Sequence, residues 1–133
     1  MLTHPRTPRI VVALAAVVLA LVVNGAMRAQ GKKDVSVVAH KYAYKVDADG
    51  PEIHVQQDDL VRITFSTEDI PHSFTMEDET YRVMRRAEPG KPVTFEFRAD
   101  KPGKFPFGCT LRADDKCKDM HGTLVVEPRK QPR

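Results

Sequence analysis

Downstream of Asp34, hydrophobic and polar residues alternate along most of the chain, in short runs separated by glycine and proline. A period of two places every second side chain on the same face, as in a β-strand with one buried face. Val61 and Phe65 share such a face, whereas Arg62 points the other way. Six segments follow this pattern and predict strands: 34–46, 51–55, 59–67, 91–99, 103–109 and 122–127.

Two stretches depart from simple alternation. In the first predicted strand the apolar positions change phase, which predicts a β-bulge near His40 or Lys41. The stretch 75–90, TMEDETYRVMRRAEPG, mixes acidic residues with arginines and indicates a charged, solvated loop. Short strands with turns about every ten residues predict an all-β fold, a β-sandwich or a barrel.

The N-terminal segment differs in character from the rest. Arg6 and Arg9 precede an uninterrupted apolar run from Ile10 to Val23. A short basic region followed by an apolar one is the layout of a secretory signal, and the longer run 10–27 approaches the length of a membrane-spanning helix. We therefore expect three parts: residues 1–29 as a signal peptide or membrane anchor, 30–128 as one domain, and 129–133 as a disordered tail.

The leader also carries the excess positive charge. The chain has 21 Lys+Arg and 18 Asp+Glu. Three of the basic residues, Arg6, Arg9 and Arg28, lie in the leader, so the remainder is neutral by count and lacks the basic footprint of a nucleic-acid-binding protein. Export would place the domain in the periplasm or another extracytoplasmic space, secreted or anchored, where paired thiols tend to become disulfides. No hydrolytic or phosphate-binding motif indicates a stand-alone enzyme.

Residues with metal-binding side chains gather near the C-terminus. The segment 104–127, KFPFGCTLRADDKCKDMHGTLVVE, contains Cys109, Cys117, Met120 and His121. Thiolate, imidazole and thioether groups are the donors that copper sites use. The same two cysteines could instead form a disulfide, which would stabilise the fold by about 2.5 kcal/mol by closing a short loop. The sequence leaves both outcomes open.

Three stretches taken together resemble the cupredoxin family, over roughly Asp34 to Pro128: EIHVQQDDLVRITFSTEDIPHSFTM, EPGKPVTFEFRADKPGKFPFGC and MHGTLVVE. They are especially similar to the copper domain of cytochrome c oxidase subunit II. The resemblance implies a Greek-key β-sandwich with a copper site that joins one upstream histidine to ligands in the last loop. His72 matches that histidine, and Cys109 matches the metal-binding cysteine.

The last loop departs from the usual family order of cysteine, histidine and methionine. Aligned on Met-x-Gly, Met120 takes the axial position and Cys117 replaces the histidine. Aligned on Cys-x-x-x-His, Cys117 pairs with His121, as in the two-copper loop of oxidase subunit II. Because neighbouring side chains of an extended segment face opposite sides, we expect only one of Met120 and His121 to be a strong ligand.

Three ligand sets follow, in this order of preference. The first is mononuclear copper held by His72, Cys109 and His121, with or without Met120. The second is binuclear copper and the third is zinc, each held by His72, Cys109, Cys117 and His121. We expect an exported copper protein that passes single electrons to a redox partner protein, tethered to the membrane through residues 10–27 if they are not cleaved. The alternatives are a copper-free module with a Cys109–Cys117 disulfide, and a copper carrier.

Overall fold

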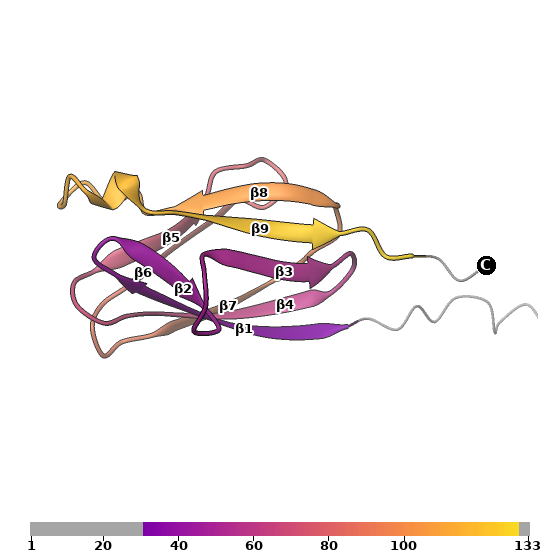
Figure 1. Cartoon of the computed structure of the whole chain (residues 1–133), viewed down its shortest axis with the longest axis horizontal. Helices are drawn as coiled ribbons and strands as arrows, with labels where there is room; N and C mark the ends of the chain where they lie inside the picture. Colours follow the sequence, from indigo (N-terminus) through magenta and orange to yellow (C-terminus); the bar gives the residue numbers. More distant parts are fainter. Residues whose placement is uncertain (1–30, 131–133) are drawn as a thin grey trace, which may run out of the picture.

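The computed structural model describes residues 31–130, so the expected signal or anchor segment lies outside the described residues. The strands are β1 (Lys32–His40), β2 (Ala43–Val46), β3 (Glu52–Gln56), β4 (Leu60–Thr67), β5 (His72–Met76), β6 (Val83–Ala87), β7 (Val93–Arg98), β8 (Gly103–Gly108) and β9 (His121–Glu127). They form a four-stranded sheet, β2-β1-β4-β7, and a five-stranded sheet, β3-β9-β8-β5-β6. The two sheets make a sandwich (Figure 1), as predicted. Within the described part of the chain, no helix is long and apolar enough to cross a membrane.

Alternation along each strand decides which side chains enter the core. Phe65 of β4 is fully buried, whereas Arg62 lies on the outer face of the same strand, with its Nε 2.7 Å from Glu96 Oε1 on β7. Aromatic rings fill the space between the sheets. Phe74 of β5 stacks on Phe107 of β8 with ring centroids 4.5 Å apart. The buried apolar area provides the main stabilisation of the sandwich.

The segment 34–46, predicted as one bulged strand, is in fact a hairpin. β1 ends at His40, β2 begins at Ala43, and the two strands pair antiparallel. The change of apolar phase therefore marks a turn at Lys41 and Tyr42, and the predicted bulge is wrong. β1 also pairs in parallel with β4, which joins the hairpin to the rest of the four-stranded sheet.

Two strands, β5 and β6, were not predicted from the sequence. All five residues of β5 are buried, so the strand lacks the alternation by which half-buried strands are recognised. β6 lies at the edge of the same sheet, and its middle residues are exposed. The stretch 75–90 is therefore not simply a loop, because β6 lies within it. His72 opens β5, a strand that the sequence analysis did not predict.

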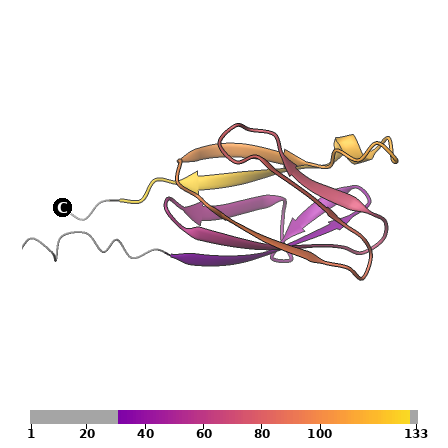
Figure 2. The ribbon, with the colours of Figure 1, turned by 180° about the vertical axis from the view of Figure 1, so that it is seen from behind.

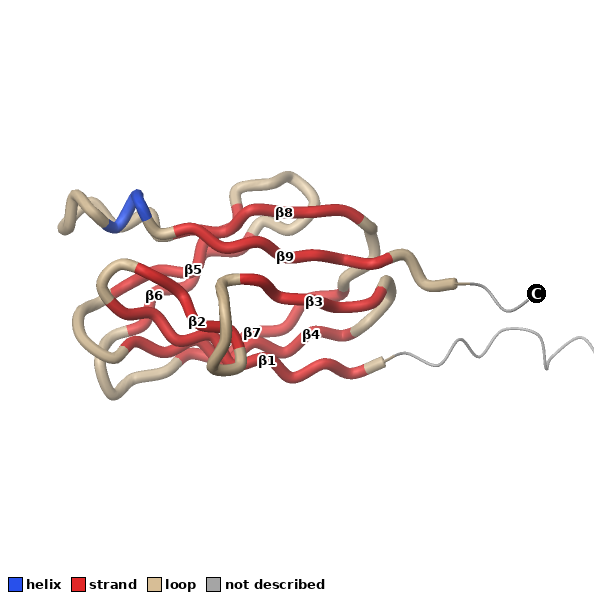
Figure 3. The backbone as a smooth tube through the Cα atoms, viewed as in Figure 1, coloured by secondary structure: helices blue, strands red, loops and turns tan. Residues whose placement is uncertain are grey.

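The segment 109–120 connects β8 to β9 and projects from one end of the sandwich (Figure 1). It contains one short 3-10 helix, η1 (Cys117–Asp119), drawn in blue in Figure 3. β1 begins and β9 ends at the opposite end of the molecule, as the view from behind in Figure 2 also shows. Arg129, expected in a disordered tail, is instead held by Asp59, with Nη2 2.6 Å from Oδ1. Residues 131–133 lie outside the described part.

Candidate metal site

Three of the predicted ligands meet at the end of the sandwich from which segment 109–120 projects. His72 begins β5, Cys109 follows β8, and Cys117 begins η1. One potential ligand atom from each residue lies within 4.8 Å of the others. All three side chains are buried. The fold therefore brings together two sulfurs and an imidazole that are separated by up to 45 positions along the sequence (117 − 72).

The two sulfurs are bonded to each other. Cys109 and Cys117 form a disulfide with their Cα atoms 5.2 Å apart, within the usual range for such bonds. Both cysteines of the sequence lie within the described residues, and neither is free. Metals bind the thiolate form, so these sulfurs could become metal ligands only after reduction. The disulfide that the sequence left open as an alternative is the state of this structure.

His72 has one paired and one unpaired ring nitrogen. Its side chain is fully buried, and Nε2 lies 3.0 Å from Asp69 Oδ1. Among the described residues Nδ1 has no hydrogen-bond partner, although it is buried. If Nε2 carries the proton and donates a hydrogen bond to the Asp69 carboxylate, the lone pair of the neutral ring is on Nδ1. In that tautomer, Nδ1 carries the lone pair that a metal ion requires.

The sequence analysis did not single out Asp69. Its Oδ2 accepts a 2.6 Å hydrogen bond from the Lys41 amide and its Oδ1 a 2.7 Å hydrogen bond from the Ile70 amide. Burial opposes ionisation of Asp69, but these bonds and the interaction with His72 outweigh it and lower the pKa of Asp69 to about 2. The carboxylate is thus ionised and fixes the imidazole. The D-x-x-H spacing, which places both residues in one tight connection, was the available signal.

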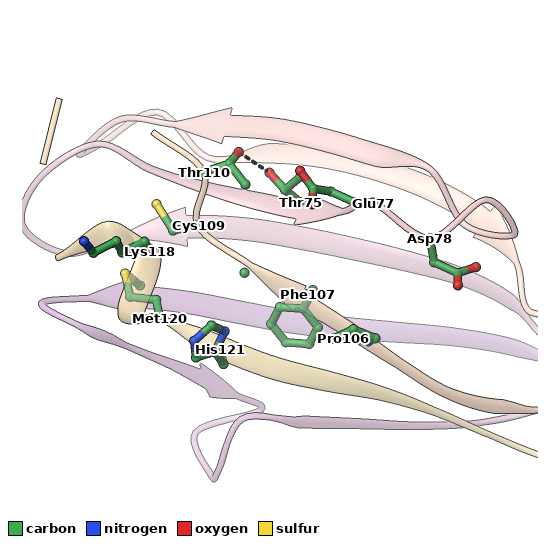
Figure 4. Close-up of a pocket in the computed structure, with 11 residues that line it drawn as sticks. Thr75, Glu77, Asp78, Pro106, Phe107, Cys109, Thr110, Lys118, Met120 and His121 are labelled. Carbon is green, nitrogen blue, oxygen red and sulfur yellow. Dashed lines mark hydrogen bonds between the residues drawn. The ribbon is translucent and has the colours of Figure 1, made fainter. Parts of the chain in front are cut away.

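Hydrogen bonds also fix Cys109 against β5. The Ser73 amide donates to Cys109 Sγ at 3.4 Å, and the Thr110 amide donates to Ser73 Oγ at 2.9 Å. The hydroxyls of Thr75 and Thr110 lie 3.0 Å apart (Figure 4). An amide directed at a sulfur favours its charged form, so the Ser73 amide would stabilise the thiolate after reduction.

Met120 and His121 are adjacent but have different environments. The Met120 side chain is fully buried and lines the same hollow as Cys109 (Figure 4). His121 is exposed and is not part of the buried ligand group. Successive side chains of extended backbone point to opposite sides, which separates the two. His121 therefore lies outside the buried group of His72, Cys109 and Cys117, whereas Met120 is buried beside Cys109. The buried potential donors are therefore the group His72, Cys109 and Cys117, with Met120 beside Cys109 in the lining of the same hollow.

This donor set fits copper in the reduced form of the chain. Two thiolates, one imidazole and one thioether are mostly soft donors, which favour copper(I). The unpaired Nδ1 of His72 supplies a buried position that a metal ion would complete. With the disulfide formed, the set does not fit, because no thiolate is present.

Comparisons with known proteins agree with this fold. The profile of the cupredoxin-like domain family matches residues 12–126. The periplasmic domain of cytochrome oxidase subunit II (CoxB) of Bradyrhizobium japonicum is 16% identical, with a TM-score of 0.63, and the match covers 77% of this chain and 88% of that one. Auracyanin A, a "blue" copper protein of Chloroflexus aurantiacus, is 17% identical with a TM-score of 0.58, covering 73% and 100%.

A third solved structure concerns cysteine chemistry. It is described as the mixed disulfide intermediate between thioredoxin-like TlpA and subunit II of cytochrome c oxidase, at 17% identity and a TM-score of 0.60, covering 72% of this chain and 82% of that one. No curated protein matches the chain. The likeness to solved structures shows the fold, and the profile match spans most of the sequence. The chain therefore belongs to the cupredoxin-like domain family.

Proposed function

We propose that this chain is an exported copper protein that transfers single electrons. One copper ion would be held by His72, Cys109, Cys117 and Met120 once the cysteines are reduced. The observation that carries the proposal is the buried Nδ1 of His72, which lacks a hydrogen-bond partner and belongs to a group that includes both sulfurs. A buried polar nitrogen without a partner is costly, and a metal ion would satisfy it.

The residues around the site would keep the ligands in place when the charge of the centre changes. Asp69 holds the imidazole ring through Nε2, and the Ser73 amide holds the Cys109 sulfur. Ligands whose orientation is fixed by surrounding hydrogen bonds rearrange little. Copper, when bound, would supply the one-electron couple, and the protein would supply this fixed surrounding.

The structural neighbours support the proposal in three respects. They include a "blue" copper protein and a subunit of an oxidase, which fits copper binding and electron transfer. The CoxB fragment is a periplasmic domain, which fits the expected export signal and an extracytoplasmic location. An oxidase subunit works beside other proteins, which fits a redox partner protein for this chain.

Thiol counting and copper titration test the proposal together. We expect no reactive thiol in the purified chain, two after reduction, and one tightly bound copper per chain only after reduction. His72→Ala should lose most of the copper affinity, because the Nδ1 ligand is gone. His54→Ala is the matched control, since His54 lies on the surface beside Glu52. Tight copper binding by the oxidised chain, or unchanged binding by His72→Ala, would contradict the proposal.

The disulfide itself favours a second candidate, a copper-free module stabilised by the Cys109–Cys117 bond. Such a module would bind no copper in either redox state. It would still unfold more easily after reduction, because the disulfide restrains the unfolded chain. Copper binding by the reduced chain therefore separates the two candidates.

A further inference from the structure

The part of segment 109–120 that carries Cys117 is shaped by hydrogen bonds within the segment. Asp114 accepts twice from the turn that follows it, from the Lys116 amide on Oδ1 and from the Cys117 amide on its carbonyl, each at 3.0 Å. The Met120 amide completes the turn by donating to Cys117 O at 3.1 Å. These bonds shape the turn but do not attach it to either sheet. The attachment has to come from other contacts.

The turn between β1 and β2, formed by Lys41 and Tyr42, reaches this segment from the four-stranded sheet. The Tyr42 hydroxyl donates to Asp114 Oδ2 at 3.1 Å, and Lys116 Nζ lies 5.6 Å from the centroid of the Tyr42 ring, close enough for a cation–π contact. Partial burial and then the hydrogen bond to Asp114 raise the pKa of Tyr42, so the phenol stays protonated and donates. In the described part of the chain, this is the one hydrogen bond that links residues 111–119 to a residue outside segment 109–120.

The same hairpin also holds the histidine side of the site. The Lys41 amide donates to Asp69 Oδ2 at 2.6 Å, and Asp69 Oδ1 lies 3.0 Å from His72 Nε2. Further along, the buried Tyr44 hydroxyl donates at 2.6 Å to the carbonyl of Ser73, which follows His72 on β5. The hairpin is itself fixed, because β1 pairs with both β2 and β4. It therefore contacts both the histidine and the loop of the site from the opposite sheet.

From these contacts we propose that Tyr42 is a positioning residue, which holds Cys117 beside Cys109 and His72 after the disulfide has opened. In the oxidised chain the covalent bond keeps the two sulfurs together. In the reduced chain that restraint is gone, and the turn can move away from Cys109 unless other contacts retain it. Tyr42 supplies such contacts, so the ligands are already assembled when copper arrives. The inference rests on the proposed function where it concerns copper, whereas its consequence for the two thiols does not.

The contacts of Tyr42 should affect two equilibria by the same factor. Forming the disulfide and binding copper both require the two sulfurs to lie side by side. Without Tyr42 the reduced loop is more often open, so the effective concentration of one thiol near the other falls. The fraction of chains that can bind copper falls equally. Loss of one hydrogen bond predicts a decrease of about three- to ten-fold in each equilibrium constant.

The dithiol–disulfide equilibrium of Tyr42→Phe tests the inference without copper. In this equilibrium the protein disulfide and two reduced glutathione molecules exchange for two protein thiols and one glutathione disulfide. Full chains are equilibrated in glutathione buffers of graded composition and quenched with acid, and their free thiols are counted by maleimide labelling. We expect the constant for forming the Cys109–Cys117 bond to fall about three- to ten-fold in Tyr42→Phe. It should fall further in Tyr42→Ala, which also loses the contact with Lys116.

Tyr81→Phe is the matched control. It removes a tyrosine hydroxyl that bonds to the backbone of Lys101, just before the start of β8, whereas segment 109–120 follows the end of that strand. Its constant should stay within about two-fold of that of the wild type, because distant sites act independently. If both Tyr42 variants stay within this range, or if Tyr81→Phe changes as much as they do, the inference is overturned.

A double-mutant cycle shows whether Tyr42 acts through Asp114. Asp114→Ala should lower the constant at least as much as Tyr42→Phe, since it also removes the acceptor of the Lys116 amide. In the Asp114→Ala background, Tyr42→Phe should have no further effect, because the hydroxyl has already lost its acceptor. A general loss of stability would not produce this coupling. Fully additive effects of the two substitutions would contradict the inference.

Copper(I) titration of the reduced variants separates this inference from the proposed function. We expect the copper(I) affinity of Tyr42→Phe, measured by competition with a chelator, to fall by the same factor as its thiol constant. A changed thiol equilibrium in a chain that binds no copper would support the inference and remove the function. Copper binding and a thiol equilibrium that both ignore Tyr42 would leave the function and overturn the inference.

Discussion

At the scale of single residues, the imidazole of His72 has two nitrogens with separate tasks. Nε2 is 3.0 Å from the Asp69 carboxylate, which fixes the ring, and this leaves the buried Nδ1 for a ligand. The sequence predicted His72 through a family resemblance but gave no weight to Asp69. The contribution of Asp69 depends on the Lys41 amide, which lies 28 positions away and reaches it only in the folded chain.

Removing the Asp69 carboxylate should weaken copper binding although Asp69 is no ligand. In Asp69→Ala the imidazole loses the acceptor that orients it and keeps the lone pair on Nδ1, so we expect the affinity of the reduced chain for copper(I) to fall about 10- to 100-fold. Competition with a chromophoric copper(I) chelator measures this change. Glu68→Ala is the control, because the neighbouring Glu68 side chain is exposed. If the copper(I) affinity of Asp69→Ala stays within about two-fold of that of Glu68→Ala, Asp69 does not act on the site.

At the scale of strands, the sequence predicted those with one face in water and missed the two that lack alternation. β5 is buried throughout and β6 is a mostly exposed edge, so neither shows a period of two. For the site, the residue types and their grouping in the last loop were predictable. Which of Met120 and His121 faces inward was not, because it depends on where β9 begins.

The start of β9 also explains the glycine of the Met-x-Gly motif. A Cβ on Gly122 would collide with the ring of Phe107, which is buried and stacked on Phe74. Gly122→Ala should therefore lower the free energy of unfolding by about 1–3 kcal/mol, as overpacked cores do. Urea denaturation followed by circular dichroism measures it.

Gly50→Ala provides the matched control for Gly122→Ala. Nothing lies within 4 Å of a Cβ at Gly50, so this variant should stay within about 0.5 kcal/mol of the wild type. Equal effects of the two variants would show that the Phe107 ring moves aside without cost.

At the scale of the whole molecule, the site and the stability of the fold share the same two sulfurs. Reducing the Cys109–Cys117 bond removes a closed loop from the unfolded chain and so raises its conformational entropy. This should lower the free energy of unfolding by about 2.5 kcal/mol. Copper at about 100 times its dissociation constant should raise the free energy of unfolding of the reduced chain by about 2.7 kcal/mol, because it binds only the folded state. The midpoints of urea unfolding for the oxidised, reduced and copper-loaded chains measure both changes.

A variant with both cysteines replaced by serine is the control for this cycle. It should respond neither to the reductant nor to copper. A reduced wild type as stable as the oxidised one would show that the bond leaves the unfolded chain unrestrained.

The position of the chain ends has a practical consequence. Because β1 begins and β9 ends at the end of the sandwich remote from segment 109–120, a handle joined directly before β1 or after β9 attaches far from that segment (Figures 1 and 2). Chains immobilised on a bead or an electrode through the C-terminus would all present that segment to the bulk fluid. Chains coupled through Lys118 would lie with it against the support and react slowly with dissolved thiols.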